Sequence, residues 1–236
     1  MIILSFVTQI SLENVIQHLK GKVKVMGFPE VFNIVELTLE GLKKRLDRND
    51  SLLIQGSAGY SEPAKFTFYP GSSDQEINAL FEEFNLVIPW DYKVFLLNHN
   101  GADLFVHPYY GGGIQLYNLN MIRQVYIDYD YVSLIPQGWI PIGSDNGDML
   151  FINTNECNDR FSSYLYWTEM LFVDNAIKVD MNFERWFERL IICNGAHFWN
   201  WNNENSERYY RHLQGRIDNL NNDHGKNYTL DFQIKV

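Results

Sequence analysis

The chain has 236 residues, of which 46% are hydrophobic and 20% are charged, so it can bury a full core and is not expected to be disordered. Its formal net charge of −10 disfavours binding to nucleic acid or to an anionic membrane, because both carry negative charge themselves. This charge suits a basic partner, although acidity can also serve solubility alone.

The cysteine content and the apolar segments favour a cytoplasmic protein. Cys157 and Cys193 are the two cysteines of the chain and give no disulfide framework. The apolar N-terminus lacks the basic region and cleavage site of a signal peptide. No run approaches the roughly 20 apolar residues that a membrane helix needs.

The beginning of the chain gives weak signals. Ser11 is typical of the cap of a short helix that runs to Lys20, and Thr38 of the cap of a second helix. The apolar side of that second helix carries Leu39, Leu42 and Leu46. Residues 51–55 and 64–69 then read as strands, and the glycines between them indicate a turn.

Two helices are predicted between residues 72 and 101. Ser73 and Glu76 make a capping box at the start of the first helix. Its buried face consists of Ile77, Leu80, Phe81 and Phe84. Pro89 suits the first turn of the second helix, and Gly101 suits the left-handed residue that follows its end. One face of this helix carries Tyr92, Phe95, Leu96 and His99.

After this helical pair the pattern takes the period of two that is typical of strands. Six short strands follow, separated by Gly, Asn, Asp and Pro, and they predict a mainly antiparallel sheet. They are residues 103–106, 113–119, 139–143, 148–153, 163–167 and 169–174. Residues 119–127, between two of these strands, indicate a helical turn.

A last clear helix begins after Asn182, which caps it, and is ended by Gly195. Its apolar stripe consists of Phe183, Trp186, Phe187, Leu190 and Ile191. The tail has the pattern of one more helix at residues 206–213 and one strand at 228–236. The predicted fold class is therefore α+β: N-terminal helices, a mainly antiparallel sheet of about six strands, and a closing C-terminal helix.

The segment Gly-Ser-Asp-Asn-Gly, residues 143–147, contains groups that catalytic and metal sites often use. It is no nucleophile elbow, because Ser144 directly follows a glycine. Asp145 and Glu156 have the end spacing of a calcium loop, but the inner ligands and the required glycine are missing. Asn146-Gly147 is the preferred pair of a type I′ hairpin, so we predict a turn.

Other candidate sites give no intact catalytic or metal-binding pattern. Gly111–Gly113 lack the helix start or the lysine of a phosphate cradle and indicate a bend beside exposed aromatics. None of the six histidines pairs with another histidine or a cysteine at zinc-ligand spacing. The sequence therefore predicts no catalytic residue, no metal and no cofactor.

Acids and tyrosines alternate in residues 126–131. If this stretch is a strand, Asp128 and Asp130 face one way and Tyr129 the other. Two interpretations stay open, a solvated edge and a docking patch for a basic protein. Residues 197–210 are rich in aromatics without a basic groove, which favours core packing with some interface use.

The order of two motifs resembles that of the SUKH superfamily. The first motif comprises Glu76, Ile77, Ile88, Pro89, Asp91, Tyr92, Lys93, Phe95, Leu96, Asn100 and Gly101. The second comprises Ile140, Pro141, Ile142, Gly143, Asp145, Gly147 and Phe151. The resemblance implies one domain at residues 66–195, an N-terminal extension at 1–65 and a C-terminal extension at 196–236.

The resemblance also implies a protein that is not an enzyme. Bacterial members of the superfamily are mostly immunity proteins that block toxins, often nucleases, and fungal relatives regulate cell-wall synthesis. The leading hypothesis is an immunity-type protein that binds a basic toxin domain. The candidate contact residues are Tyr109, Tyr110, Asp128, Tyr129, Asp130, Asp145 and Asp148. A regulator or scaffold of envelope synthesis and a hydrolase with carboxylates from distant strands are the alternatives.

Overall fold

The computed structural model describes residues 33–56, 59–130, 134–169, 173–203, 205–208, 210–211 and 214–215. The helix predicted from Ser11 to Lys20 and the strand predicted at 228–236 lie outside these residues. The tail helix predicted at 206–213 is helical at each of its described residues.

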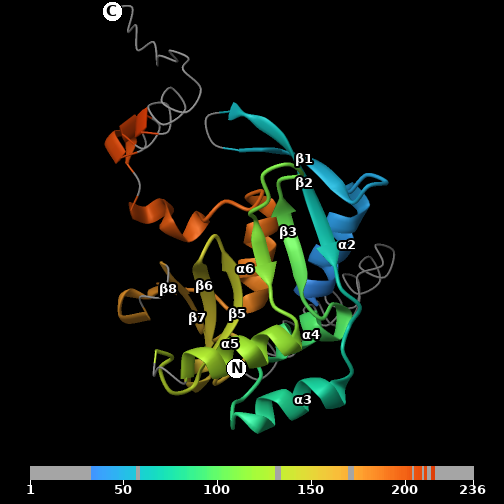
Figure 1. Ribbon diagram of the computed structural model, residues 1–236, viewed down its shortest axis with the longest axis vertical. Helices are drawn as coiled ribbons and strands as arrows, with labels where there is room; N and C mark the ends of the chain where they lie inside the picture. Colours follow the sequence, from blue (N-terminus) through green and yellow to red (C-terminus); the bar gives the residue numbers. More distant parts are fainter. Residues whose placement is uncertain are drawn as a thin grey trace, which may run out of the picture.

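An eight-stranded sheet forms the centre of the fold (Figure 1). Each strand pairs with its neighbours in the sequence, and every pairing is antiparallel. The strands are β1 (Ser51–Gln55), β2 (Ser61–Phe68), β3 (Ala102–Val106), β4 (Ile114–Leu116), β5 (Trp139–Asp145), β6 (Asp148–Asn153), β7 (Leu165–Thr168) and β8 (Ile177–Val179). The α+β fold class is confirmed, with eight strands in the sheet where about six are predicted.

This strand order separates two kinds of connection. Because successive strands run in opposite directions, the turns β1–β2, β3–β4 and β5–β6 reach the same end of the sheet. We call this the turn end and define it as residues 59–62, 107–113 and 145–148, at the top of the sheet in Figure 1. The β7–β8 connection reaches this end as well, and the connections between strands that carry α-helices lie at the opposite end.

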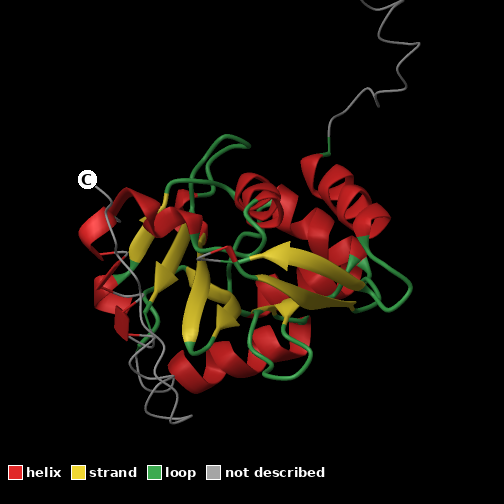
Figure 2. Cartoon of the chain, turned by 90° about the horizontal axis from the view of Figure 1, so that it is seen from above, coloured by secondary structure: helices red, strands yellow, loops and turns green. Residues whose placement is uncertain are grey.

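Helices cover both faces of the sheet (Figure 2). They are α2 (Ile34–Arg45), α3 (Asp74–Glu83), α4 (Trp90–Asn98), α5 (Leu119–Asp130) and α6 (Phe183–Ile192). The helices α2, α4 and α6 contact one another, whereas α5 contacts β5 and α3. Figure 1 shows α5 in front of the strands and α6 behind them.

The core lies on both faces of the sheet, and a large part of it is formed with α6. Alternate strand residues such as Leu104, Ile142 and Trp167 are fully buried, as the period of a strand requires. Trp186 and Phe187 of α6 are fully buried against them, and the predicted apolar stripe of this helix is confirmed. Large aromatic side chains at this contact supply much of the buried apolar surface.

Two predicted local motifs are confirmed. The Ser73 hydroxyl caps α3 by accepting a hydrogen bond from the Glu76 amide. The Glu76 carboxylate accepts a hydrogen bond from the Ser73 amide in return, which completes the capping box. The β5–β6 hairpin turns at Asn146 and Gly147, whose φ values of 50° and 99° fit the predicted turn.

Two predicted helix starts are wrong. The first helix starts at Ile34 and is capped by Asn33, whose side chain accepts the Glu36 amide, rather than by Thr38. The earlier start brings Val35 into the buried stripe of this helix. Pro89 is the N-cap residue of α4 instead of part of its first turn.

The stretch that contains Asp128, Tyr129 and Asp130 is helical, so its interpretation as a strand is wrong up to Asp130. The Asn118 side chain accepts the Met121 amide and starts α5 in the manner of an N-cap. Helical spacing then places the apolar residues of α5 toward the sheet, and this packing overrides the strand preference of tyrosine and isoleucine.

The strand predicted at residues 169–174 is wrong in its described part. Residues 173–175 form a 3-10 turn, closed by a bond from the Ala176 amide to the Val173 carbonyl. The last strand of the described residues is β8, three residues further on, which pairs with β7. Asp174 and Asn175 favour a turn because their short polar side chains compete with strand hydrogen bonds.

The predicted domain boundaries at residues 65 and 195 stay predictions. β2 runs across the first of them, and β1 and β2 continue the same sheet. The helix α2, which precedes β1, packs against α6.

Replacing Gly113 by alanine is expected to destabilise the fold more than the same change at Gly111. Both residues have positive φ, so each alanine is strained by about 1–2 kcal/mol. A Cβ at Gly113 would in addition lie 2.5 Å from the Leu104 carbonyl oxygen, whereas one at Gly111 meets open space. Urea unfolding should show a further loss of about 1–3 kcal/mol for Gly113→Ala. Equal losses would contradict this packing.

Candidate functional site

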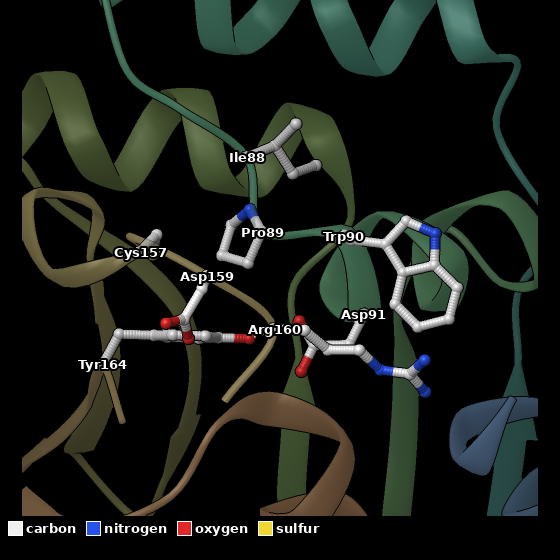
Figure 3. Close-up of a pocket in the computed structure, with 8 residues that line it drawn as sticks. All are labelled: Ile88, Pro89, Trp90, Asp91, Cys157, Asp159, Arg160 and Tyr164. Atoms are coloured by element: carbon white, nitrogen blue, oxygen red, sulfur yellow. Dashed lines mark hydrogen bonds between the residues drawn. The ribbon is translucent and has the colours of Figure 1, made fainter. Parts of the chain in front are cut away.

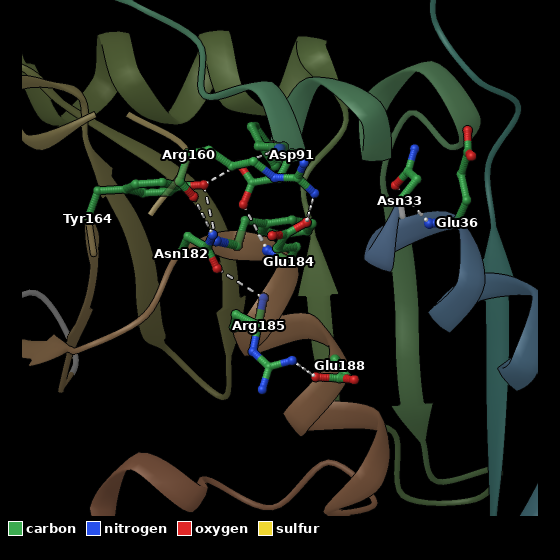
Figure 4. Close-up of polar contacts among 11 residues, drawn as sticks. Asn33, Glu36, Asp91, Arg160, Tyr164, Asn182, Glu184, Arg185 and Glu188 are labelled. Atoms are coloured by element: carbon green, nitrogen blue, oxygen red, sulfur yellow. Dashed lines mark hydrogen bonds and ion pairs between the residues drawn. The ribbon is translucent and has the colours of Figure 1, made fainter. Parts of the chain in front are cut away.

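One of the two most buried charged residues of the described chain lies at the start of α4. Asp91 is 5% exposed, and three donors surround its carboxylate (Figure 4). The Tyr92 amide donates to Oδ1 over 3.0 Å, and the Tyr164 hydroxyl donates to the same oxygen. The Glu184 amide donates to Oδ2 over 2.9 Å.

These donors join two helix N-termini to one carboxylate. Asp91 lies in the first turn of α4, and Glu184 lies in the first turn of α6. First-turn amides have no partner within their helix and favour a negative charge. The Tyr164 hydroxyl also accepts a hydrogen bond from the Phe183 amide over 3.1 Å. It therefore connects the chain just before β7 to the start of α6. We call Asp91, Tyr164, Phe183 and Glu184 the helix clamp.

A second buried carboxylate, Glu184, belongs to this region. Its Oε2 lies 3.8 Å from the Arg160 guanidinium, which also lies 4.9 Å from the centre of the Trp90 ring. Burial, followed by the charge of Asp91, raises the pKa of the Glu184 carboxyl, and Arg160 opposes this rise.

A cavity of about 230 Å³ opens beside the clamp (Figure 3). Its lining includes Trp90, Asp91, Cys157, Asp159, Arg160 and Tyr164. Burial, with the charges of Asp91 and Glu156, raises the pKa of the Cys157 thiol to about 12. A thiol with such a pKa stays protonated at neutral pH and is a poor nucleophile. The cavity is thus lined in part by Asp91 and Tyr164, which belong to the clamp, and by a thiol of low reactivity.

The turn end presents different chemistry, beginning with two tyrosines. Tyr109 and Tyr110 are 85% and 88% exposed in the β3–β4 loop. The backbone amides of both donate to His107 Nδ1, over 3.2 and 3.1 Å. The His107 ring also stacks on the Tyr110 ring, with centroids 4.6 Å apart. The loop therefore holds both tyrosines in a fixed arrangement.

The β5–β6 hairpin lies next to this loop. A Cβ on Gly112 would lie 3.4 Å from the Asn146 Oδ1 atom, so the two turns are in close approach. Asp145 accepts the Asn146 side-chain amide over 2.8 Å and lies 2.8 Å from His197 Nε2. His197 in turn packs on Trp199, in the segment after α6, with ring centroids 4.8 Å apart.

The structure divides the predicted contact residues into two groups. Tyr109, Tyr110, Asp145 and Asp148 lie at the turn end. Asp128, Tyr129 and Asp130 form the end of α5, which crosses the strands near the opposite end of the sheet (Figure 1). Tyr129 packs against the core, and Asp128 is exposed and accepts the Gln124 amide. The seven residues therefore do not form one patch.

The sequence gives no signal for His107 and His197. His107 accepts hydrogen bonds from amides two and three residues away, and these bonds form only because the loop folds back on the ring. His197 reaches Asp145 across 52 positions of the chain, a contact that the fold alone creates. The predicted core use of the aromatic segment is confirmed for Trp199, which packs on Trp167 and Trp186.

Two features are absent from the part of the chain that the structure describes. Among the described residues, no group of three or more His, Cys, Asp or Glu side chains is placed to hold a metal ion. None of the helices in the described ranges combines the length and apolar character needed to cross a membrane.

Comparison with known proteins gives a family and two relatives. The model of the SMI1/KNR4 family (SUKH-1) matches residues 71–189, about half of the chain. The uncharacterized protein YnaB of Bacillus subtilis (strain 168) is 34% identical over 150 residues, which cover 64% of this chain and 96% of that protein. The uncharacterized protein YobM of the same organism is 31% identical over 186 residues, which cover 76% of this chain and 98% of that protein.

Asp91→Ala is expected to lower the free energy of unfolding by about 3–5 kcal/mol, because it leaves buried donors without an acceptor. Asp159→Ala is the matched control. Asp159 lines the same cavity but is exposed and bonds only within its own loop. This control should lose less than about 1 kcal/mol in urea unfolding. A similar loss for both variants would contradict the role of the clamp.

Cys157 is expected to react with iodoacetamide roughly a thousand-fold more slowly than an ordinary thiol at pH 8, because its pKa of about 12 leaves little thiolate. Burial also raises the pKa of the Cys193 thiol. Mass spectrometry of a time course should show slow labelling in the native state and rapid labelling in urea. Fast native labelling of Cys157 would instead indicate an activated thiol.

Proposed function

Because the chain belongs to the SMI1/KNR4 family (SUKH-1), we propose that it acts by binding another protein and that this protein is a bacterial toxin, which it neutralises. The two relatives come from a bacterium, and the resemblance implies an immunity role for bacterial members. The partner is a basic toxin domain, often a nuclease in this family.

The observation that carries this proposal is the residue composition of the turn end, together with the contacts that fix its tyrosine loop. Its 15 residues, 59–62, 107–113 and 145–148, contain the carboxylates of Glu62, Asp145 and Asp148 and no lysine or arginine. They also contain Tyr109 and Tyr110, which His107 holds in place. Carboxylates attract a basic partner during encounter, and desolvated tyrosines slow its release.

The chemistry of the cavity beside the clamp supports a role without catalysis. Asp91 uses both oxygens to hold two helices, so it could act as a general base only by releasing them. The raised pKa of Cys157 keeps its thiol protonated. A hydrolase would need a carboxylate or nucleophile that is free to react, and these two groups are engaged or inactive.

Co-expression with the toxin encoded beside its gene tests the proposal. Cells that make both proteins should survive, and cells that make the toxin alone should die. Purification of the complex then identifies the bound protein. Capture of an envelope-synthesis protein, with no protection from the toxin, would favour a regulator or scaffold and overturn the immunity role.

The double variant Tyr109→Ala/Tyr110→Ala is expected to lose protection, because truncating interface anchors costs about 2 kcal/mol or more each, or roughly 30-fold in Kd. Phe161→Ala is the matched control. Phe161 is 90% exposed but lies in the β6–β7 connection, at the other end of the sheet. Calorimetry with the purified toxin should separate the two variants. Equal binding by both would place the interface elsewhere.

A further inference from the structure

A second cavity lies at the turn end, between the β3–β4 hairpin and β5. Its volume is about 360 Å³, toward the lower end of the range of about 300–1,000 Å³ that is usual for small-molecule sites. The residues used below that line it are Asp103, Gly112, Gly113, Gln115, Ser144 and Asn146. Two of them belong to the loop that presents Tyr109 and Tyr110, so the cavity opens within the proposed contact surface.

Asp103 is the charged group of this cavity. The Tyr69 hydroxyl donates to its Oδ2 over 2.6 Å, and the Gln115 amide donates to its Oδ1 over 3.1 Å. The hydrogen bond to Asp103 raises the pKa of Tyr69, so the hydroxyl stays a donor. Both donors are neutral, and no lysine or arginine in the described ranges forms an ion pair with Asp103.

The carboxylate of Asp103 has capacity left. An ionised carboxylate offers about four acceptor positions, and the two bonds from Tyr69 and Gln115 occupy two of them. One hydrogen bond to each oxygen orients the Asp103 side chain, but no ion pair of the described residues neutralises its charge. It is therefore prepared to accept further donors that carry positive charge.

Asn146 adds a second acceptor oxygen to the lining. The Asn146 side chain uses its Nδ2 to bond Asp145, which leaves its Oδ1 oxygen beside Gly112. Gly113 cannot carry a side chain, because a Cβ there would lie 2.5 Å from the Leu104 carbonyl. Gly112 and Gly113 line the cavity without side chains that would fill it.

We propose that this cavity receives an arginine side chain of the protein partner, with Asp103 as its counter-charge. A guanidinium has five N–H donors, no acceptor and a permanent charge, which matches the acceptors of the lining. Tyr109 and Tyr110 contact the partner surface around the inserted arginine. This inference rests on the proposed function, because it names the chemistry by which the same surface recognises its partner.

The probe for a direct test is N-acetyl-L-arginine amide, with N-acetyl-L-citrulline amide as its neutral isostere. An NMR titration should show saturable shifts of the Gly112 and Gly113 amides and of the Gln115 side chain, with a Kd on the order of 1 mM. The citrulline compound should produce no saturable shift. Equal binding of both compounds, or no binding of the arginine compound, would overturn the proposal.

Asp103→Asn should weaken the arginine probe at least about tenfold, because it removes the charge and keeps the size of the side chain. Asp148→Asn makes the same change in net charge at the turn end, outside this cavity, and should have little effect. Ser144→Lys leaves Asp103 in place but brings an ammonium group into the cavity, and it should also abolish binding. Spectra of each variant report whether the fold is retained.

The same variants separate this proposal from the proposed function. With a captured toxin, Asp103→Asn should weaken binding about 30-fold, and Asp148→Asn should weaken it less. If the toxin binds Asp103→Asn as tightly as the unchanged protein, the arginine site is wrong and the immunity role stands. If no toxin is neutralised, the titration with the arginine probe still decides whether the cavity binds a guanidinium.

Discussion

The fold depends on one buried carboxylate that serves two helices. Asp91 accepts the first-turn amide of Glu184 in α6 while it lies in the first turn of α4, and Tyr164 completes its shell. Buried amides without an acceptor are costly, and the N-terminal ends of helices stabilise a negative charge. The Asp91 carboxylate therefore serves as the acceptor and is itself stabilised by the helix ends. A change in the position of either helix would break these bonds together. The helix pair behind the sheet is thereby fixed as a unit.

This constraint acts at the end of the sheet where the helices are connected, away from the two exposed tyrosines of the turn end. The hairpin loops need glycines and Asn146 for their conformations, but Tyr109 and Tyr110 contribute almost nothing to the core. A rigid scaffold with side chains displayed on short loops is the usual arrangement of a binding protein. It allows the loops to fit a partner while the clamp maintains the fold.

Local patterns in the sequence predict most of the fold, because they reflect local physics. The capping box at Ser73 and the hairpin at Asn146 depend on neighbouring residues, and both are present. The end of α5 could not be predicted, because alternating acids and tyrosines have the pattern of a strand. The helical conformation depends on the tertiary packing of Tyr129 against the core. Long-range contacts are beyond such patterns: Asp91 meets the Glu184 amide across 93 positions of the chain.

The difference between Asp91 and Asp103 shows how hydrogen-bond satisfaction separates a structural group from a binding group. Asp91 is buried, and its donors are two helix amides and the hydroxyl of Tyr164, the residue before β7. Asp103 receives two neutral donors and faces an open cavity at the turn end. A buried carboxylate that accepts three bonds from the protein has little capacity left for a ligand, whereas one that accepts two bonds beside an open cavity can gain both hydrogen bonds and charge neutralisation. The same residue type thus stabilises the fold in one place and is available for recognition in the other.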